Sequence, residues 1–473
     1  MQVAKKSNFF IYGVSAIAAI AGLLFGFDTG IISGALLFIK KDFYISTEMQ
    51  ELIVSSVLLG AMVGSLCSGR LTDKFGRRKL LILISSLFIL GTAIASFATS
   101  ISGILFGRLF IGLAIGIGSY TAPLYIAEVS PFELRGALVS LNQLAITLGI
   151  LSSYIINYLF TNINGSWRWM FGIGLIPAIL LTLGMFFLPE SPRWLVKQNM
   201  LDKARRTLQR LRQSGDVVHE LTEIEHSLKV KQASFKEIFS PWVRPVLFLG
   251  AMLGLIQQVT GINTIIYYAP SIFQLAGFHD ASTSILATVG IGIVNVLATI
   301  FAIAYLDRIG RRPLLLAGLI GMALSLFGLS FAFYAHSGTE SLRWLSLVCT
   351  FTYIICFAFS LGAILWLMVS EIFPLEVRAT AMGVAVFSCW FWNFVVSSTF
   401  LTLLNYFGPS STFLFYAIMC LFSLVFCYYK TPETKGVTLE QIEENIRQGL
   451  PLREIGQPSQ KHIMQTASDI VTG

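Results

Sequence analysis

Twelve apolar stretches recur along the whole chain, and they restrict its possible folds more than any other feature. About 20 apolar residues in a helix span the roughly 30 Å of hydrocarbon in a bilayer. Charged residues make up only 12% of the chain, so this much apolar surface cannot be buried in one water-soluble core. The stretches cover residues 9–37, 50–68, 80–98, 103–127, 138–160, 169–188, 244–275, 281–305, 313–334, 344–369, 380–404 and 411–429.

Each stretch is interpreted as a transmembrane helix, because a helix satisfies its own backbone hydrogen bonds in lipid. The basic segments all fall on one face when the helices are counted, and the positive-inside rule makes that face, with both termini, cytoplasmic. This distribution explains the net charge of +8 without a nucleic-acid partner. The basic segments are Lys5–Lys6, Arg70–Lys79, Arg193–Lys236, Arg308–Arg312 and Lys430–Arg453.

Three pairs of motifs indicate that the chain is a repeat. DKFGRR at residues 73–78 returns as DRIGRR 234 residues later, and AEVSPFELRG at 127–136 returns as SEIFPLEVRA after 243 residues. PESPRW at 189–194 returns as PETKG, also after 243 residues. Parallel repeats of this kind form two six-helix halves with the substrate between them near the midplane. The predicted parts are a first half 1–189, a linker 190–240, a second half 241–430 and a cytoplasmic tail 431–473.

The linker and the tail carry the polar sequence of the chain. Apolar residues keep helical spacing over 201–211 and 218–228, and the tail segment 437–446 is similar. We predict short amphipathic helices there, on the cytoplasmic face, and disorder beyond about residue 455.

Several signatures give a resemblance to a known family. GRLTDKFGRR, PESPRW, QQVTGIN, YLDRIGRR and PETKG resemble those of the sugar porters in the major facilitator superfamily. GSWRWMFGIGLIPAILL and LREIG are most similar to the bacterial galactose- and arabinose-type proton symporters. The resemblance implies the major facilitator fold, a monosaccharide substrate, alternating access and a bacterial inner membrane.

A sugar site needs amides that both donate and accept hydrogen bonds, together with aromatic plates. Buried amides are costly in lipid unless they are satisfied, so a group of them indicates either a polar cavity or contacts between helices. The resemblance assigns sugar contacts to Gln143, Gln257, Gln258, Asn263, Asn295, Trp366 and Asn393. It assigns the cavity wall to Phe25, Tyr267, Tyr268 and Trp390.

Two positions depart from the family pattern, and two others bear on the sugar. Ala363 follows Gly362 where the family has proline, and Cys389 stands where it often has an amide, which Asn393 replaces in part. Ile150 and Ile266 are apolar at positions that tune hexose against pentose in the family, which favours a hexose.

Acidic and basic residues at the repeated motifs predict a cytoplasmic gate. In the family such residues form salt-bridge networks that hold the inner side closed in the outward-facing state. Positive-inside anchoring alone explains the arginines but not the acids at matching offsets. The predicted gate residues are Asp73, Arg77, Arg78, Glu128, Arg135, Asp307, Arg311, Arg312, Glu371 and Arg378.

Asp28, in GFDTG, is the one carboxylate inside an apolar stretch and away from its ends. Burying a charge there costs about 2.5–3.5 kcal/mol, so the residue needs a partner or a function. Counted along their helices, Asp28 and Arg108 lie about 13 Å and about 8 Å from the same membrane face, close enough for long side chains to meet. The resemblance makes them the proton-coupling pair, while a static structural pair remains the alternative.

We therefore predict a monosaccharide–proton symporter that acts as a monomer, draws on the proton gradient and has no cofactor. The alternatives are a facilitative sugar uniporter, a drug or metabolite antiporter and a sugar-sensing receptor, the last disfavoured by the short tail. The chain contains no HExxH, CxxC or GxxxxGK[ST] motif, so we expect no metal site and no enzyme.

Overall fold

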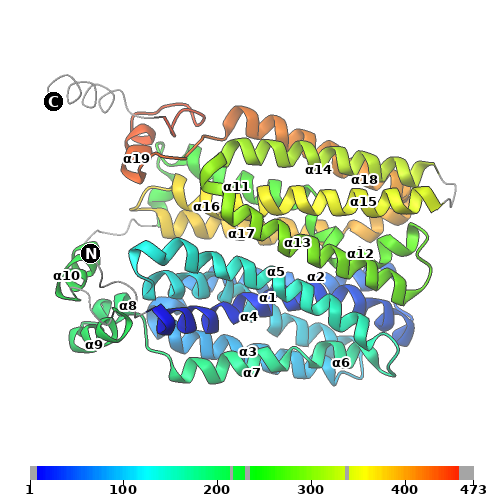
Figure 1. Ribbon diagram of the computed structural model, residues 1–473, viewed down its shortest axis with the longest axis horizontal. Helices are drawn as coiled ribbons and strands as arrows, with labels where there is room; N and C mark the ends of the chain where they lie inside the picture. Colours follow the sequence, from blue (N-terminus) through cyan, green and yellow to red (C-terminus); the bar gives the residue numbers. More distant parts are fainter. Residues whose placement is uncertain (1–7, 213–216, 229–234, 336–339, 458–473) are drawn as a thin grey trace.

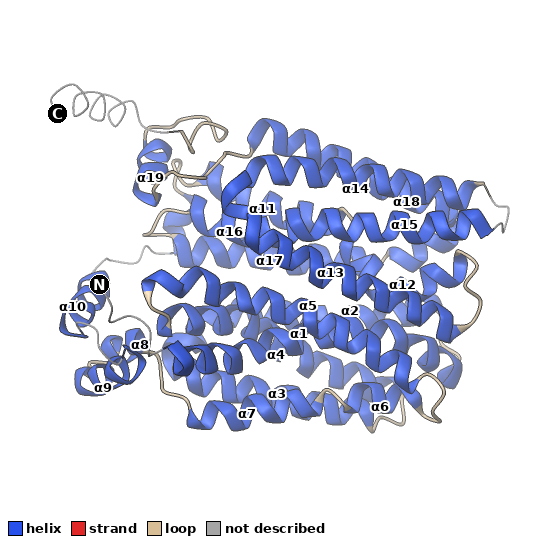
Figure 2. Ribbon diagram, in the orientation of Figure 1, coloured by secondary structure: helices blue, strands red, loops and turns tan. Residues whose placement is uncertain are grey.

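The computed structural model describes residues 8–212, 217–228, 235–335 and 340–457, and these residues form helices and connecting loops without a strand (Figure 2). The first group of helices is α1 (Asn8–Phe43), α2 (Thr47–Phe75), α3 (Arg77–Ser96), α4 (Ile101–Val129), η1 (Phe132–Leu134), α5 (Arg135–Phe160), α6 (Ser166–Gly172) and α7 (Leu175–Phe187). Between the groups lie α8 (Pro192–Lys197), α9 (Leu201–Arg212), α10 (Val217–Leu228) and η2 (Phe235–Phe239). The second group is α11 (Arg244–Val259), α12 (Ile262–Leu275), α13 (Ala281–Ile309), α14 (Arg311–Tyr334), α15 (Glu340–Phe357), η3 (Ala358–Gly362), α16 (Ala363–Ile372), α17 (Arg378–Ser397) and α18 (Phe400–Lys430), followed by α19 (Leu439–Arg447).

The described residues contain 12 segments long and apolar enough to span a membrane, as the sequence predicts. Three of these spans are interrupted helices: α6 with α7, α11 with α12, and α15 with α16. Gly261 separates α11 from α12 with a φ of 92°, and a π-helical turn at 358–362 separates α15 from α16. Irregular backbone at membrane depth occurs where protein or a cavity surrounds it, so the interruptions at Gly261 and at 358–362 mark the interior of the bundle.

The predicted stretch 380–404 is wrong at its end, because α17 stops at Ser397 and α18 already begins at Phe400. Ser398 and Thr399 end α17 by donating their hydroxyls to the carbonyls of Val395 and Val396. An apolar count cannot detect this turn, since the residues on both sides of it are apolar. Within α18, Gly408 has a φ of 77° and bends the helix.

The helices assemble into two halves, one from α1–α7 and one from α11–α18, that lie beside each other along the bundle (Figure 1). In the first half α1 packs on α5 and α2 on α4, and in the second half α11 packs on α17 and α14 on α18. The contact of α2 with α4 is very close at Gly112, where a Cβ would overlap the carbonyl of Val57. Small residues at such crossings allow helices to pack tightly in lipid, where there is little hydrophobic drive.

The face of the bundle that holds Asn8 of α1 and Lys430 of α18 is called the terminal face here, and the other is the opposite face. The predicted short helices are present as α9, α10 and α19, on the terminal face (Figure 1). The predicted disorder beyond residue 455 concerns mainly residues 458–473, which lie outside the described part of the chain. Between the halves, α5 packs on α13, α2 on α17 and α1 on α12.

Candidate functional site

Asp28 and Arg108 lie together in the interior of the first half. Nη1 of Arg108 is 3.4 Å from a carboxylate oxygen of Asp28, and both side chains are buried. The guanidinium also donates to the carbonyls of Ile53, at 2.7 Å, and Val54, at 3.4 Å. Arg108 is therefore held by α2 as well as by Asp28. If the carboxylate of Asp28 becomes neutral, the guanidinium still has two carbonyl acceptors in α2.

Three of the predicted sugar-contacting amides form one hydrogen-bonded cluster with a thiol. Nε2 of Gln258 donates to Oε1 of Gln257 at 3.2 Å and to Sγ of Cys389 at 3.1 Å. Asn263 donates to Oε1 of Gln258 at 2.7 Å, and Cys389 donates to Gln257 at 3.1 Å. Gln257 in turn donates to the carbonyl of Leu361 in the π-helical turn. The Gly261 interruption makes this cluster, because it lets Asn263 on α12 turn back toward Gln258 on α11.

Aromatic side chains from both halves meet next to this cluster. The rings of Phe25 on α1 and Trp390 on α17 lie 5.4 Å apart. Trp390 is buried, and its Nε1–H has no hydrogen-bond partner among the described residues. A buried donor without a partner is costly, so this indole is suited to an acceptor such as a hydroxyl. Asn393, one helical turn beyond Cys389, donates to the hydroxyl of Tyr267 at 3.4 Å.

Four predicted site residues lie outside these contacts. Tyr268 is fully buried in the second half, stacked on Phe400 with its hydroxyl donated to the carbonyl of Ser397. Asn295 is buried on α13, Gln143 is partly exposed on α5, and Trp366 on α16 is 37% exposed. The structure gives none of these three a hydrogen bond to the amide cluster within the described residues, and their contacts with sugar stay predictions.

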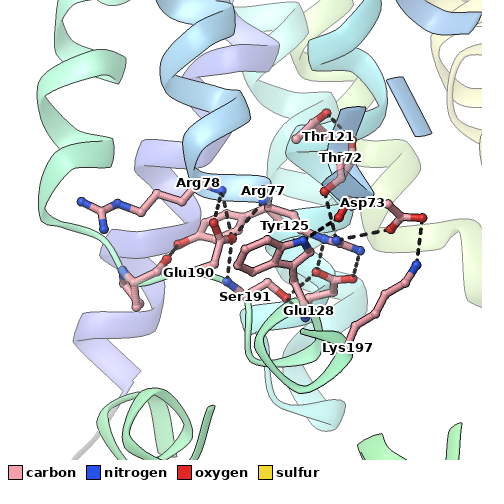
Figure 3. Close-up of polar contacts among 12 residues, drawn as sticks. Thr72, Asp73, Arg77, Arg78, Thr121, Tyr125, Glu128, Glu190, Ser191 and Lys197 are labelled. Atoms are coloured by element: carbon pink, nitrogen blue, oxygen red, sulfur yellow. Dashed lines mark hydrogen bonds and ion pairs between the residues drawn. The ribbon is translucent and has the colours of Figure 1, made fainter. Parts of the chain in front are cut away.

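On the terminal face of the first half, the repeated motifs form a network of charged residues (Figure 3). Arg77 makes a two-pronged contact with Glu128, through Nε at 2.8 Å and Nη2 at 2.9 Å. Asp73 lies 3.6 Å from Arg77 and 2.9 Å from Nζ of Lys197 in α8. Glu190 accepts from the backbone N–H groups of Arg77 and Arg78 and so caps the start of α3.

The second half repeats this arrangement. Arg311 contacts Glu371 at 3.1 Å, and Glu433 accepts from the backbone N–H groups of Arg311 and Arg312. Thr434 donates to Glu371 as Ser191 donates to Glu128. None of these contacts joins α1–α7 to α11–α18, so each network connects the helices of one half with one another and with the segment that follows that half.

Arg135 and Arg378 are placed differently from the sequence expectation. Each begins a helix, and the guanidinium of Arg135 lies over the ring of Phe132, while Arg378 donates to the carbonyl of Phe373. The arginine networks described above thus involve neither residue. The side chain of Asp307 is not among those described.

Sequence reasoning missed the roles of Glu190, Ser191, Glu433 and Thr434. Their only signal was the recurrence of PE-S/T after the sixth and twelfth helices, at the same lag of 243 residues as Glu128 and Glu371. Burial raises the pKa of the Glu190 carboxyl, and the N–H groups of Arg78, Ser191 and Arg77 oppose the shift.

Among the described residues, no group of three or more histidine, cysteine, aspartate or glutamate side chains is arranged to hold a metal ion. The amide cluster offers neutral donors and acceptors near the contact between the halves, and Asp28 with Arg108 forms a buried ion pair. Such a set can bind a hydroxylated neutral molecule and move a proton.

Comparison with known proteins gives consistent matches over most of the chain. Residues 14–446 match the family described as sugar (and other) transporter. The chain is 42% identical over 456 residues to the galactose-proton symporter of Escherichia coli, covering 96% of this chain and 97% of that protein. It is 41% identical to the D-xylose transporter of Levilactobacillus brevis, over 94% of this chain and 96% of that protein.

A solved structure supports the same assignment of fold. The xylose transporter XylE from E. coli, in a partially occluded inward-open conformation, superposes with a TM-score of 0.80 at 30% identity. The match covers 91% of this chain and 99% of that one. The arrangement of twelve spans in two halves is therefore the major facilitator fold, as the sequence predicts.

Proposed function

This chain belongs to the sugar transporter family, and we propose that it carries a monosaccharide into the cell together with a proton. It is a polytopic membrane protein and a transporter, not an enzyme. The observation that carries the proton coupling is the buried pair of Asp28 with Arg108. Phe25, which contacts Trp390, lies one helical turn before Asp28 on α1, so a sugar and a proton would bind close together.

The sugar would bind between the halves, on the amide cluster and the Phe25–Trp390 pair. Gln257, Gln258 and Asn263 supply donors and acceptors, and the indole of Trp390 supplies a donor that needs an acceptor. We propose a hexose as the substrate because Ile150 and Ile266, at the positions that the resemblance associates with the choice between hexose and pentose, are both apolar and buried. One chain contains every residue of this site, which supports action as a monomer.

The proposed direction follows from charge. The basic residues of both networks lie on the terminal face, which supports a cytoplasmic location for that face. On the opposite face α2 and α18 are joined by hydrogen bonds between the halves, which supports a state closed to the outside. The similarity to an inward-open conformation of XylE supports the same state.

Coupling would work through the charge on Asp28. When ionised, Asp28 pairs with Arg108 and restrains α1 against α2 and α4. When protonated, it releases the guanidinium, which keeps the carbonyls of Ile53 and Val54, and the loaded carrier reorients. One charge crossing 100 mV supplies about 2.3 kcal/mol, so one proton per sugar could concentrate the sugar roughly 40-fold.

The test is uptake into proteoliposomes with an imposed proton gradient. Wild-type protein should accumulate galactose or glucose above the outside concentration, and an uncoupler should abolish this, with xylose as the pentose to compare. Asp28→Asn should still exchange labelled for unlabelled sugar but should not accumulate it. Asp280→Asn, an exposed carboxylate, is the matched control and should behave as wild type. Accumulation by Asp28→Asn would contradict the role of Asp28, and uncoupler-insensitive equilibration by wild type would identify a uniporter.

A further inference from the structure

Glu51, near the start of α2, makes one of the contacts between α2 and α18, and the coupling through Asp28 assigns no role to this residue. Its side chain is only 3% exposed although it carries a carboxyl group. One carboxylate oxygen accepts from the backbone N–H of Thr402, and the other accepts from the hydroxyl of Thr402, each at 2.7 Å. Thr402 lies 351 residues away in the other half.

The contact places a carboxylate at the N-terminus of α18. The first backbone N–H groups of a helix have no partner within the helix, and the helix dipole favours negative charge there. Thr399, the residue before α18, gives no side-chain cap to it. Glu51 therefore serves as the cap of a helix that belongs to the opposite half, through charge-assisted hydrogen bonds.

Two other hydrogen bonds also join the halves. Thr47, one helical turn before Glu51, accepts a hydrogen bond of 2.9 Å from Asn405, one turn after Thr402. The hydroxyl of Tyr154 on α5 donates to the carbonyl of Ile266 on α12, at 3.0 Å. All three contacts join the first half to the second, and the two made by α2 lie on the face opposite the termini.

We propose that Glu51 is a latch residue that holds the carrier closed on its outer face. Separation of α2 from α18 would remove both hydrogen bonds and expose the first turn of α18, so the capped state is the one closed to the outside. The inference rests on the alternating access of the proposed function. It assigns to Glu51 a preference between the two states, whereas Asp28 exchanges the proton.

The experiment measures the distance between the outer ends of the halves. Spin labels at Lys41→Cys and Tyr406→Cys, both exposed, report it in protein in which the exposed Cys67 and the partly exposed Cys349 are replaced by serine and the four buried cysteines, Cys389 among them, are kept. Glu51→Gln keeps the size and removes the charge, and Thr402→Val removes the hydroxyl. Glu48→Gln, an exposed carboxylate on the same helix, is the matched control.

Glu51→Gln should raise the ratio of outward-open to closed molecules about tenfold, because a hydrogen bond to a charged group is worth more than one between neutral groups. Thr402→Val should shift the ratio in the same direction, and the double variant should shift it by less than the product of the two. Glu48→Gln should leave the distance distribution unchanged.

Distances in Glu51→Gln and Thr402→Val identical to wild type would overturn the latch. An equal shift in Glu48→Gln would overturn it as well, because the effect would then be one of surface charge. If addition of galactose and a change of pH leave the wild-type distances unaltered, it is the proposed alternating access that fails. A lower melting temperature without a change in distances identifies Glu51 as a structural residue only.

Discussion

Replacing Gln258 by alanine tests the sugar site most directly, because Gln258 is at the centre of the amide cluster. Its amide donates to Gln257 and Cys389 and accepts from Asn263, at 2.7–3.2 Å. Truncation removes the groups proposed to bind the sugar and also frees Asn263 to rotate. A neutral hydrogen bond contributes about 1 kcal/mol, so loss of two to the sugar weakens binding by about 2 kcal/mol, or roughly 30-fold in Kd.

Calorimetry of the purified protein with galactose measures this change. Gln274→Ala, which removes an amide from the far end of α12, is the matched control and should bind as wild type. Asn263→Ala should weaken binding by a similar factor, and the double variant should be less affected than the product, since the two amides share a hydrogen bond. Unchanged affinity in Gln258→Ala at wild-type melting temperature would refute the assignment of the site.

The charged network on the terminal face gives two further predictions. Arg77→Ala breaks the two-pronged contact with Glu128, so the rate of sugar uptake should fall several-fold while the affinity for sugar is retained. An uptake rate equal to that of wild type would mean that the motif serves only to orient the helices in the membrane. Because burial raises the pKa of Glu190 in the folded protein, its protonation stabilises the fold as the pH falls, and this contribution is lost as the pH rises through the raised pKa. The difference between the melting temperatures of wild type and Glu190→Gln should therefore be more favourable to wild type at pH 5 than at pH 7.5. A difference that does not change with pH would contradict the raised pKa of Glu190.

Much of the site could be predicted because its geometry is local or set by the membrane. Asp28 and Arg108 could be paired by counting residues along two helices that share a membrane face. Gln257, Gln258 and Asn263 lie within seven residues, and the helix interruption at Gly261 brings them together. Both charged networks could be predicted from the repeated motifs, since Glu128 and Glu371 occupy equivalent positions in the two repeats.

Contacts with backbone groups could not be predicted in this way. The carboxylates of Glu190 and Glu433 cap helices that begin more than 100 residues earlier, and a backbone N–H has no sequence signature. Glu51 lies at the end of an apolar stretch, and no local signal in the sequence indicates its partner Thr402, which lies in the other half. Arg135 and Arg378 follow the motif spacing, yet the turn that starts each helix directs the guanidinium to Phe132 or Phe373.

The position of the two networks along the chain has a consequence for biosynthesis. Every named partner of Arg77 precedes residue 200. The charged network of the first half can therefore form while the ribosome is still synthesising the second half. The partners of Arg311 and Arg312 include Glu433, beyond the twelfth span, so the corresponding network is complete only after that span has been made. A nascent chain that stops at Lys430 has all twelve spans but lacks that acceptor, and the short segment after it completes the second half.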